Sequence, residues 1–597
     1  MRRFFTIIAF GLLASAAYGQ GTAKRYIPPV DFKMYLSGNF GEIRDNHFHS
    51  GIDIKTQGVT GKIIRAVADG YVSRIAVSPT GYGNALYIHH PDGMTSVYGH
   101  LERFNDEIAE YVRDVQYKRE SFPVDLYLSR WQFPVNQGEI IAYSGNSGSS
   151  AGPHLHFELR EQATQNPVNV IAGGYLDGIE DTIPPRLVKL RRNLVMRESM
   201  QFLKKEYELV KEGGIYTLKD TSIDLFSNRH PSDSNDFDYY VLEVTDRKNG
   251  SDNTMGIYSI TVEVDGKQVF GYRMDKLSFA ESRYVNSFAN YPLNRKNRND
   301  VINLNIAPNN KLSAYTGGDG NIRLIRGEGE KDSMGITDNY LSVGDLHEVK
   351  ISVKDDSGNE SILEFKAATS LGLFYSLAAE PAHYVGLEIP FVYSDSLFTV
   401  KIPAGTAYWP FHMQIIRPLS PAEAKIPRPV LSQILKLGDE SLTPLHTPMT
   451  VSIRPDSIPA GLRNKLCLAS RNESGRIVYE GGTVRGDSIE VSTRTFGDYF
   501  VTIDTVPPTI APAFAGNADL RGSDKMTIKI SDDFSGISKW RITVDGSWAL
   551  FDYDRKTNTL THYFKYARYE KGKTHTLTAT AEDARGNKTT VTRKFIY

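Results

Sequence analysis

Three short motifs occur twice in this 597-residue chain, in the same order both times. An Asp-Thr-x-Pro-Pro segment comes first, a segment that runs from Gly-Ile to Val-Asp-Gly follows, and a turn that ends in Gly-Asn comes last. The paired prolines favour an extended entry into each copy. A repeat of this kind predicts two copies of one β-sandwich unit. The motifs are Asp181–Pro185, Gly256–Gly266 and Val353–Asn359 in the first copy, and Asp504–Pro508, Gly536–Gly546 and Ala581–Asn587 in the second.

The rest of the tail is also predicted to be β structure. In residues 371–504, apolar and polar residues alternate in short segments such as Met449–Ile453 and Ser488–Ser492, which is typical of half-buried strands. The first repeat unit carries a long polar insertion, residues 272–342, for which the sequence offers no interpretation. We therefore expect a mainly β chain. An N-terminal domain over 24–178 is followed by three β-sandwich-like domains over 179–370, 371–504 and 505–597.

The first nineteen residues resemble a cleavable signal peptide. Arg2 and Arg3 precede an apolar run from Phe4 to Ala17, and small residues stand before Gln20. No other apolar run reaches the length of about eighteen residues that a membrane span needs. The net charge of -1 provides no general attraction to nucleic acid. The mature chain is thus expected to be exported to the periplasm or the cell surface, without a membrane span and without a nucleic-acid partner.

The N-terminal domain is predicted to be an antiparallel β-sheet with one helical insertion. Between about residues 102 and 133, apolar residues recur at helical spacing among charged ones. This insertion follows His100, so it forms either a wall of a cleft near that residue or a surface helix that covers a sheet edge. The expected strands are Ile63–Ala68, Gly70–Val77, Ala85–His90, Thr95–Leu101 and Glu139–Ser144.

Histidines and one aspartate in this domain suggest a metal site. His154 and His156 are two residues apart in a predicted strand, so both imidazoles point to the same face. His49 and Asp53 are separated by about 13 Å in extended chain, and Gly51 would have to allow a bend that brings them together. Two histidines and one carboxylate leave the fourth position of a zinc ion open, as a catalytic site requires. The spacing alone does not rank these ligands against the other histidines of the domain, which are His47, His89, His90 and His100.

Three separated motifs resemble the lysostaphin/LytM-type zinc endopeptidases of bacterial cell-wall metabolism. They are His49–Asp53, Tyr98–Leu101 and Gly152–Glu158, and the resemblance extends over about residues 38–170. It implies that His49, Asp53 and His156 bind one Zn²⁺, whereas His154 and His100 are catalytic. The implied substrate is peptidoglycan, cut at a peptide bond of its stems or cross-links by a zinc-activated water.

The resemblance also implies a role for each catalytic histidine. His154 would act as the general base towards the water and then protonate the leaving amine. His100 would either hydrogen-bond the tetrahedral intermediate or position the water. An alternative is a non-catalytic protein of the same fold that binds peptidoglycan or activates another hydrolase. Such proteins usually lack some of these residues, and all five positions are filled here, which favours the enzyme. A third reading, an adhesive array with a vestigial peptidase, has little support in the even composition of the tail.

Overall fold

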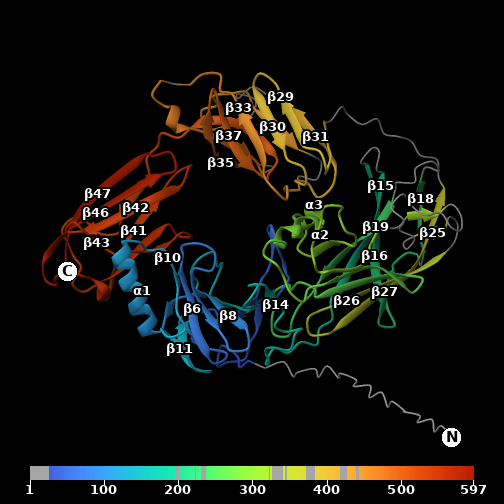
Figure 1. Cartoon of the computed structure of the whole chain (residues 1–597), viewed down its shortest axis with the longest axis horizontal. Coiled ribbons are helices and arrows are strands. Elements are labelled where there is room, and N and C mark those ends of the chain that lie inside the picture. The colour runs from blue at the N-terminus through green and yellow to red at the C-terminus, as the bar shows by residue number, and fades with distance from the viewer. Residues whose placement is uncertain are drawn as a thin grey trace, which may run out of the picture.

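The computed structural model confirms the mainly β fold, and its sheets follow one another around a ring (Figure 1). The signal peptide predicted over residues 1–19 and parts of the polar insertion lie outside the described residues. No helix among the described residues is long and apolar enough to cross a membrane. The structure describes residues 26–196, 201–221, 223–229, 237–321, 323–325, 340–342, 346–371, 383–416, 426–438, 443–458, 460–472 and 474–597.

The N-terminal part is built on a nine-stranded sheet whose strands pair antiparallel, in the order β1-β4-β13-β8-β7-β6-β10, with β11 beside β6 and β14 beside β13. A three-stranded sheet, β5-β12-β9, and a hairpin, β2-β3, complete it. The strands are β1 (Leu36–Gly38), β2 (Ile43–Arg44), β3 (His47–Phe48), β4 (Ile52–Lys55), β5 (Ile63–Arg65), β6 (Gly70–Val77), β7 (Asn84–His89), β8 (Met94–Leu101), β9 (Arg103–Phe104), β10 (Val124–Tyr127), β11 (Pro134–Val135), β12 (Ile140–Tyr143), β13 (His154–Glu161) and β14 (Pro167–Val168).

The predicted helical insertion is helical only in its first half. Helix α1 (Asp106–Arg119) begins at the N-cap Asn105, whose side chain accepts a hydrogen bond from the backbone N–H of Ile108. Beyond the helix, β10 and β11 pair with β6. Residues 124–127 alternate buried and exposed, so their period of two favours a strand over the helix that we expected.

The second group of strands forms an eleven-stranded sheet, in the order β22-β19-β15-β16-β17-β27-β26-β20-β21-β23, with β18 beside β27. Two strands, β24 and β25, pair separately, and three short helices, η1, α2 and α3, occupy the polar insertion. The elements are β15 (Arg186–Met196), β16 (Gln201–Glu212), β17 (Ile215–Leu218), β18 (Ile223–Arg229), β19 (Phe237–Thr245), β20 (Ser259–Val264), β21 (Lys267–Arg273), η1 (Ser282–Tyr284), α2 (Val285–Phe288), α3 (Tyr291–Asn294), β22 (Asp300–Asn303), β23 (Tyr315–Asp319), β24 (Arg323–Ile325), β25 (Tyr340–Ser342), β26 (His347–Lys354) and β27 (Glu360–Leu371).

The third group pairs a six-stranded sheet, β28-β31-β32-β38-β34-β35, with a five-stranded one, β29-β30-β33-β37-β36, around one apolar core. Its elements are β28 (His383–Val385), β29 (Phe391–Ser394), β30 (Phe398–Ile402), β31 (Phe411–Ile416), β32 (Leu435–Gly438), β33 (Met449–Ile453), η2 (Arg463–Lys465), β34 (Leu466–Arg471), β35 (Ile477–Gly481), β36 (Thr483–Arg485), β37 (Ser488–Thr493) and β38 (Gly497–Ile503).

The last group pairs a four-stranded sheet, β39-β41-β45-β44, with a five-stranded one, β40-β47-β46-β42-β43. Its elements are β39 (Thr509–Pro512), β40 (Ala518–Asp519), β41 (Lys525–Ser531), β42 (Ile537–Val544), β43 (Ser547–Trp548), β44 (Asp552–Asp554), β45 (Thr559–Tyr563), η3 (Phe564–Tyr566), β46 (Thr574–Asp583) and β47 (Lys588–Ile596).

The two copies of the repeat have the same strand pairing. In the first copy β20 pairs with β21 and with β26, and β26 pairs with β27. In the second copy β42 pairs in the same way with β43 and β46, and β46 with β47.

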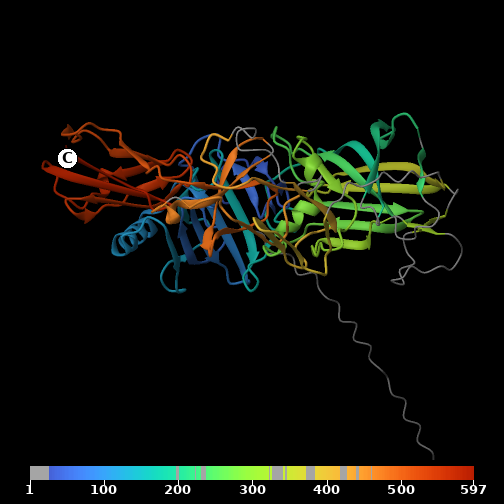
Figure 2. The same cartoon turned by 90° about the horizontal axis from the view of Figure 1, so that it is seen from above.

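The ring closes because the last sheets contact α1 (Figures 1 and 2). The rings of Tyr117 on α1 and Trp548 are 5.2 Å apart at their centroids, edge to face. Ion pairs of 2.6 Å join Arg568 to Asp114 and Arg541 to Glu120 at the same contact. The helix therefore connects the first and the last parts of the chain, a role that neither interpretation of the insertion anticipated.

Candidate metal centre

Two adjacent strands bring the predicted ligands together. His156 on β13 is the direct cross-strand partner of Asp53 on β4. His49 precedes β4, and the chain bends at Gly51, as the sequence required. A side chain at Gly51 would not fit, because a Cβ atom there would lie 2.4 Å from the backbone oxygen of Phe157. The close approach of β13 to the bend therefore depends on glycine.

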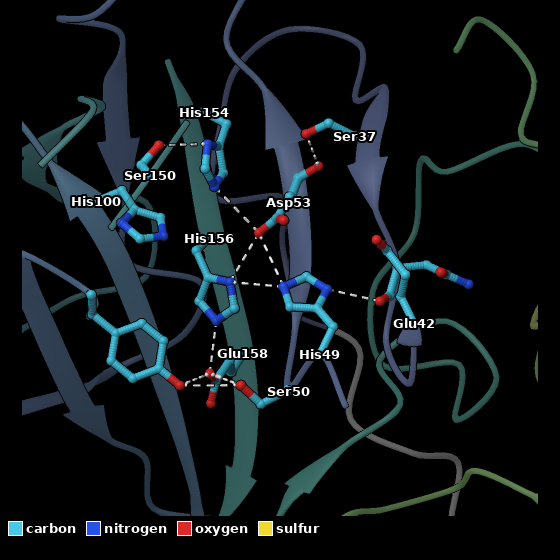
Figure 3. A network of polar contacts seen from close by, with 12 residues as sticks. Ser37, Glu42, His49, Ser50, Asp53, His100, Ser150, His154, His156 and Glu158 are labelled. Carbon is cyan, nitrogen blue, oxygen red and sulfur yellow. Dashed lines mark hydrogen bonds and ion pairs between the residues drawn. The ribbon is translucent and has the colours of Figure 1, made fainter. Parts of the chain in front are cut away.

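Three ligand atoms face one point between these strands (Figure 3). The Nε2 atom of His49 lies 3.2 Å from Oδ1 of Asp53 and 3.1 Å from Nδ1 of His156, and the last two atoms are 2.9 Å apart. A tetrahedral zinc ion with ligands at about 2.0 Å would space its donors about 3.3 Å apart. Two imidazoles and one carboxylate in this spacing fit zinc.

The side-chain atoms of His49 and Asp53 that point away from the cluster form hydrogen bonds with other residues. His49 donates its Nδ1–H to the backbone oxygen of Asn39 at 2.8 Å, so Nε2 carries the lone pair that a metal needs. Asp53 accepts a hydrogen bond from Arg44 on Oδ2 at 2.7 Å, so that Oδ1 remains for the metal. Such outer partners fix the orientation of ligands in protein metal sites.

A buried carboxylate holds His156. The Nε2–H of His156 donates to Glu158 at 2.7 Å, which directs Nδ1 towards His49 and Asp53. The side chain of Glu158 is fully buried, and it also accepts hydrogen bonds from Ser50, Tyr82 and Arg160 at 2.6–2.7 Å. A charged group buried to this degree needs several partners, and Glu158 has four.

The electrostatics of the cluster favour an ionised Asp53. Burial on its own would raise the pKa of Asp53, but the charge of His49 and hydrogen bonds from the surrounding imidazoles lower it well below its usual value. Burial would lower the pKa of His156, but hydrogen bonds to Asp53 and Glu158 outweigh that effect and raise it to about 9. In the protein without metal, His156 therefore carries a second proton, on Nδ1, which a bound cation would replace.

His154 and His100 lie side by side next to the three ligands, with ring centroids 4.8 Å apart (Figure 3). The Nε2 atom of His154 is 3.4 Å from Oδ1 of Asp53, and 15% of its side chain is exposed, against 4–6% for the three ligands. His100 has a left-handed backbone, φ 59°, at a register shift between β7 and β8. A left-handed backbone is uncommon for residues other than glycine, and bulges of this kind redirect side chains. Here the bulge occurs where the side chain of His100 lies beside the other histidines.

The remaining histidines of the domain lie in other surroundings. His47 is exposed, with Nδ1 2.8 Å from the backbone oxygen of Asp45. His89 contacts the hydroxyl of Tyr71, and His90 is buried beside Ser96. None of these three belongs to the ligand cluster.

Four supporting residues had no role in the sequence interpretation: Asn39, Arg44, Tyr82 and Glu158. Only Glu158 could have been predicted from the sequence, because it lies two residues after His156 and therefore on the same face of the strand. Asn39 lies in the loop after β1 and Arg44 in the β2-β3 hairpin. Neither segment has a periodic pattern that would indicate a contact with the site.

The hairpin β2-β3, next to His49, packs into the second group of strands. Phe48, 1% exposed, belongs to the apolar core of that group, and its ring centroid is 5.6 Å from that of Phe288 on α2. Its backbone N–H donates to Ser282 in η1. The polar insertion that the sequence left unexplained thus supports the segment that carries His49, a predicted metal ligand.

Replacing Phe48 by alanine is therefore expected to weaken both the domain contact and metal binding. The lost burial should cost about 3–5 kcal/mol of stability, and the loosened His49 should lower zinc affinity about tenfold or more. Thermal melting and zinc titration measure the two effects. Phe398, also 1% exposed but in the third core, is the matched control: Phe398→Ala should destabilise the chain without changing zinc affinity. Equal zinc affinity in both variants would contradict the supporting role.

Comparison with known proteins identifies the N-terminal domain. Residues 47–116 and 130–170 match the model of Peptidase family M23, and residues 383–504 match that of the Zu5-like domain. The DD-carboxypeptidase/endopeptidase Mpg of Neisseria gonorrhoeae is 34% identical over 123 residues, which are 20% of this chain and 22% of that protein. The glycyl-glycine endopeptidase ALE-1 of Staphylococcus capitis is 27% identical over 119 residues, 20% of this chain and 26% of that protein.

Among solved structures, the catalytic domain of the prophage-encoded M23 protein EnpA from Enterococcus faecalis is 25% identical, with a TM-score of 0.17. The match covers 23% of this chain and 87% of that one. The chain spans about a fifth to a quarter of the length of the curated relatives it matches. The sequence matches, together with the His-Asp-His cluster, assign residues 47–170 to Peptidase family M23, the lysostaphin/LytM-type zinc metallopeptidases.

Proposed function

We propose that this chain is an exported zinc-dependent endopeptidase that hydrolyses peptide bonds in the stems or cross-links of peptidoglycan. The observation that carries the proposal is the convergence of His49, Asp53 and His156, each with its outer atom held by another group. When bound there, zinc would polarise the substrate carbonyl and make a water molecule more acidic. The names of the relatives, a DD-carboxypeptidase/endopeptidase and a glycyl-glycine endopeptidase, support the substrate class.

His154 is suited to the role of general base. Its Nδ1 lies 2.8 Å from the backbone oxygen of Gly152, which can only accept, so Nδ1 carries the proton. The Nε2 atom consequently carries the lone pair, and it lies beside the cluster, 3.4 Å from Oδ1 of Asp53. In this orientation it can take a proton from an attacking water and pass it to the leaving amine.

The contacts of His100 favour one of its two expected roles. Its Nδ1–H donates to the backbone oxygen of Ser147 at 2.9 Å, and burial, reinforced by the neighbouring histidines, lowers its pKa to about 3. At neutral pH, Nε2 of His100 therefore carries a lone pair and accepts a hydrogen bond. A neutral acceptor is suited to position the attacking water and cannot donate to an oxyanion.

Digestion of purified peptidoglycan by the mature full-length chain tests the proposal. We expect soluble peptide-containing fragments with the zinc-loaded protein, none after treatment with a chelator, and full recovery when zinc alone is added back. Mass analysis of the fragments identifies the bond that is cut. Binding of peptidoglycan without any release of fragments would refute the proposal and favour a non-catalytic binding protein.

A further inference from the structure

In the part of the chain that the structure describes, two clusters of aspartates lie outside the peptidase site, one in each copy of the repeat. In each cluster three carboxylates place one oxygen within 4.8 Å of the others. The first contains Asp181, Asp246 and Asp355, and the second contains Asp504, Asp532 and Asp583.

The members of the two clusters occupy equivalent positions. Asp181 and Asp504 begin the Asp-Thr-x-Pro-Pro motifs, and Asp355 and Asp583 begin the turns that end in Gly-Asn. Asp246 and Asp532 each follow directly on a strand, β19 and β41. Another shared contact supports the equivalence, since Nδ1 of His347 and His575 lies 2.7 Å and 2.6 Å from the aspartate of the respective Val-Asp-Gly motif.

Among the described residues, each cluster contains a buried carboxylate oxygen that accepts no hydrogen bond of normal geometry. Asp246 is 2% exposed, and neither of its oxygens accepts a hydrogen bond of normal geometry. Burial and the nearby charge of Asp355 raise the pKa of Asp246 to about 8. In the second cluster, Asp532 is half-buried; its Oδ2 accepts hydrogen bonds from the backbone of Phe534 and Gly536, whereas its buried Oδ1 has no partner. Native structures rarely leave such oxygens unsatisfied, because burying a carboxylate without partners is costly.

Each cluster has more negative charge than its neighbours neutralise. Lys248 bonds to Asp356, and its Nζ lies 3.1 Å from Asp181. In the second cluster, Arg428 lies 3.9 Å from Asp504 and 3.2 Å from Asp533. Among the described residues, four carboxylates therefore share one cationic side chain at each cluster, Lys248 at the first and Arg428 at the second.

We propose that each cluster binds one Ca²⁺ ion. The donors are all oxygens, which Ca²⁺ prefers and which are a poor match for zinc. Oxygens around Ca²⁺ lie at about 2.4 Å from the ion, so two of them can be up to about 4.8 Å apart, as the clusters allow. The unpartnered oxygens of Asp246 and Asp532 complete the argument, because a bound cation gives them the partner that the protein does not.

The positions of the two sites suggest what the ions would do. Asp504 follows β38 and begins the last repeat unit, so the second ion would fix the junction between the third and fourth groups of strands. The first cluster is close to the peptidase site, because Asn39 donates to Asp356 at 3.1 Å while its backbone oxygen holds His49. The ions would therefore stiffen two domain junctions, one of them in contact with the metal centre.

Calcium titration of the full-length chain tests the proposal. The protein is freed of metals, reloaded with one equivalent of zinc, and titrated with Ca²⁺ by equilibrium dialysis. We expect two Ca²⁺ per chain for the wild type, one for Asp246→Asn or Asp532→Asn, and none for the double variant. The exposed Asp252, in the loop after Asp246, is the matched control: Asp252→Asn should bind two.

Zinc content and thermal melting separate this result from other outcomes. All variants should keep their zinc, so the test stands whether or not the chain is a peptidase. The wild type should melt at a higher temperature with Ca²⁺ than without, and the double variant should not respond. A wild type that binds no Ca²⁺ and melts equally with and without it would overturn the proposal, since a proton would then be what neutralises each cluster. Saturation by Mg²⁺ without a response to Ca²⁺ would also overturn it.

Discussion

Asp53→Ala is expected to abolish zinc retention. The substitution removes one of three donors, and it leaves the Arg44 guanidinium, now 2.7 Å from Oδ2 of Asp53, beside the site with Glu42 at 3.4 Å as its remaining counterion. A positive charge in place of a carboxylate should repel a dication, so we expect zinc affinity to fall by well over the 10- to 100-fold typical of losing an outer partner. Elemental analysis after dialysis should find about one zinc per chain in the wild type and almost none in the variant.

Asp45 provides the control for this experiment. It is an exposed aspartate at the turn of the β2-β3 hairpin, eight residues before Asp53. Asp45→Ala should therefore retain zinc as the wild type does. Circular dichroism of both variants checks that the sheet is intact. One equivalent of zinc in a folded Asp53→Ala protein would show that the ligand set is wrong.

The sequence predicted the parts of this site that depend on local geometry. The two-residue spacing of His154 and His156 places both side chains on one face of β13. The approach of His49 to Asp53 required a bend, and the bend lies at Gly51, where a Cβ atom would meet the backbone oxygen of Phe157 on β13. These inferences need only the period of a strand and the steric freedom of glycine.

The support of the site could not be predicted, because it comes from distant parts of the chain. Asn39 positions His49 while it contacts Gly256 and Asp356, which are 217 and 317 residues away in sequence. No periodicity links such residues, since they meet only when two domains pack together. The polar insertion was hard to interpret for the same reason: its buried rings Tyr284 and Phe288 contact His446 and Phe48, which belong to other groups of strands.

The helical insertion shows where a correct pattern was extended too far. Helical spacing identified α1, with Ile108 and Val112 buried in the core of the first domain. The alternation of Val124 and Leu126 further along has the period of a strand, and these residues pair with β6. The two periods follow each other within one polar segment, so the sequence alone placed the end of the helix too late.

His154→Ala is expected to keep zinc and lose turnover. His154 is not one of the three clustered residues, and 15% of its side chain is exposed, against 4–6% for His49, Asp53 and His156. Loss of a general base typically slows an enzyme by about 10²- to 10⁴-fold, and that range should apply to the rate of peptidoglycan cleavage. Zinc content and cleavage rate should be measured on the same preparation, because only their separation supports the role.

His47→Ala is the matched control, since His47 is an exposed histidine two residues from a ligand. It should retain both zinc and the wild-type rate. Normal cleavage by His154→Ala would refute the general-base role. Loss of zinc from that variant would instead place His154 among the ligands, because its Nε2 lies 3.4 Å from Asp53. Retained zinc with a slowed reaction is the one result that assigns the proton transfer to His154, while His49, Asp53 and His156 hold the metal.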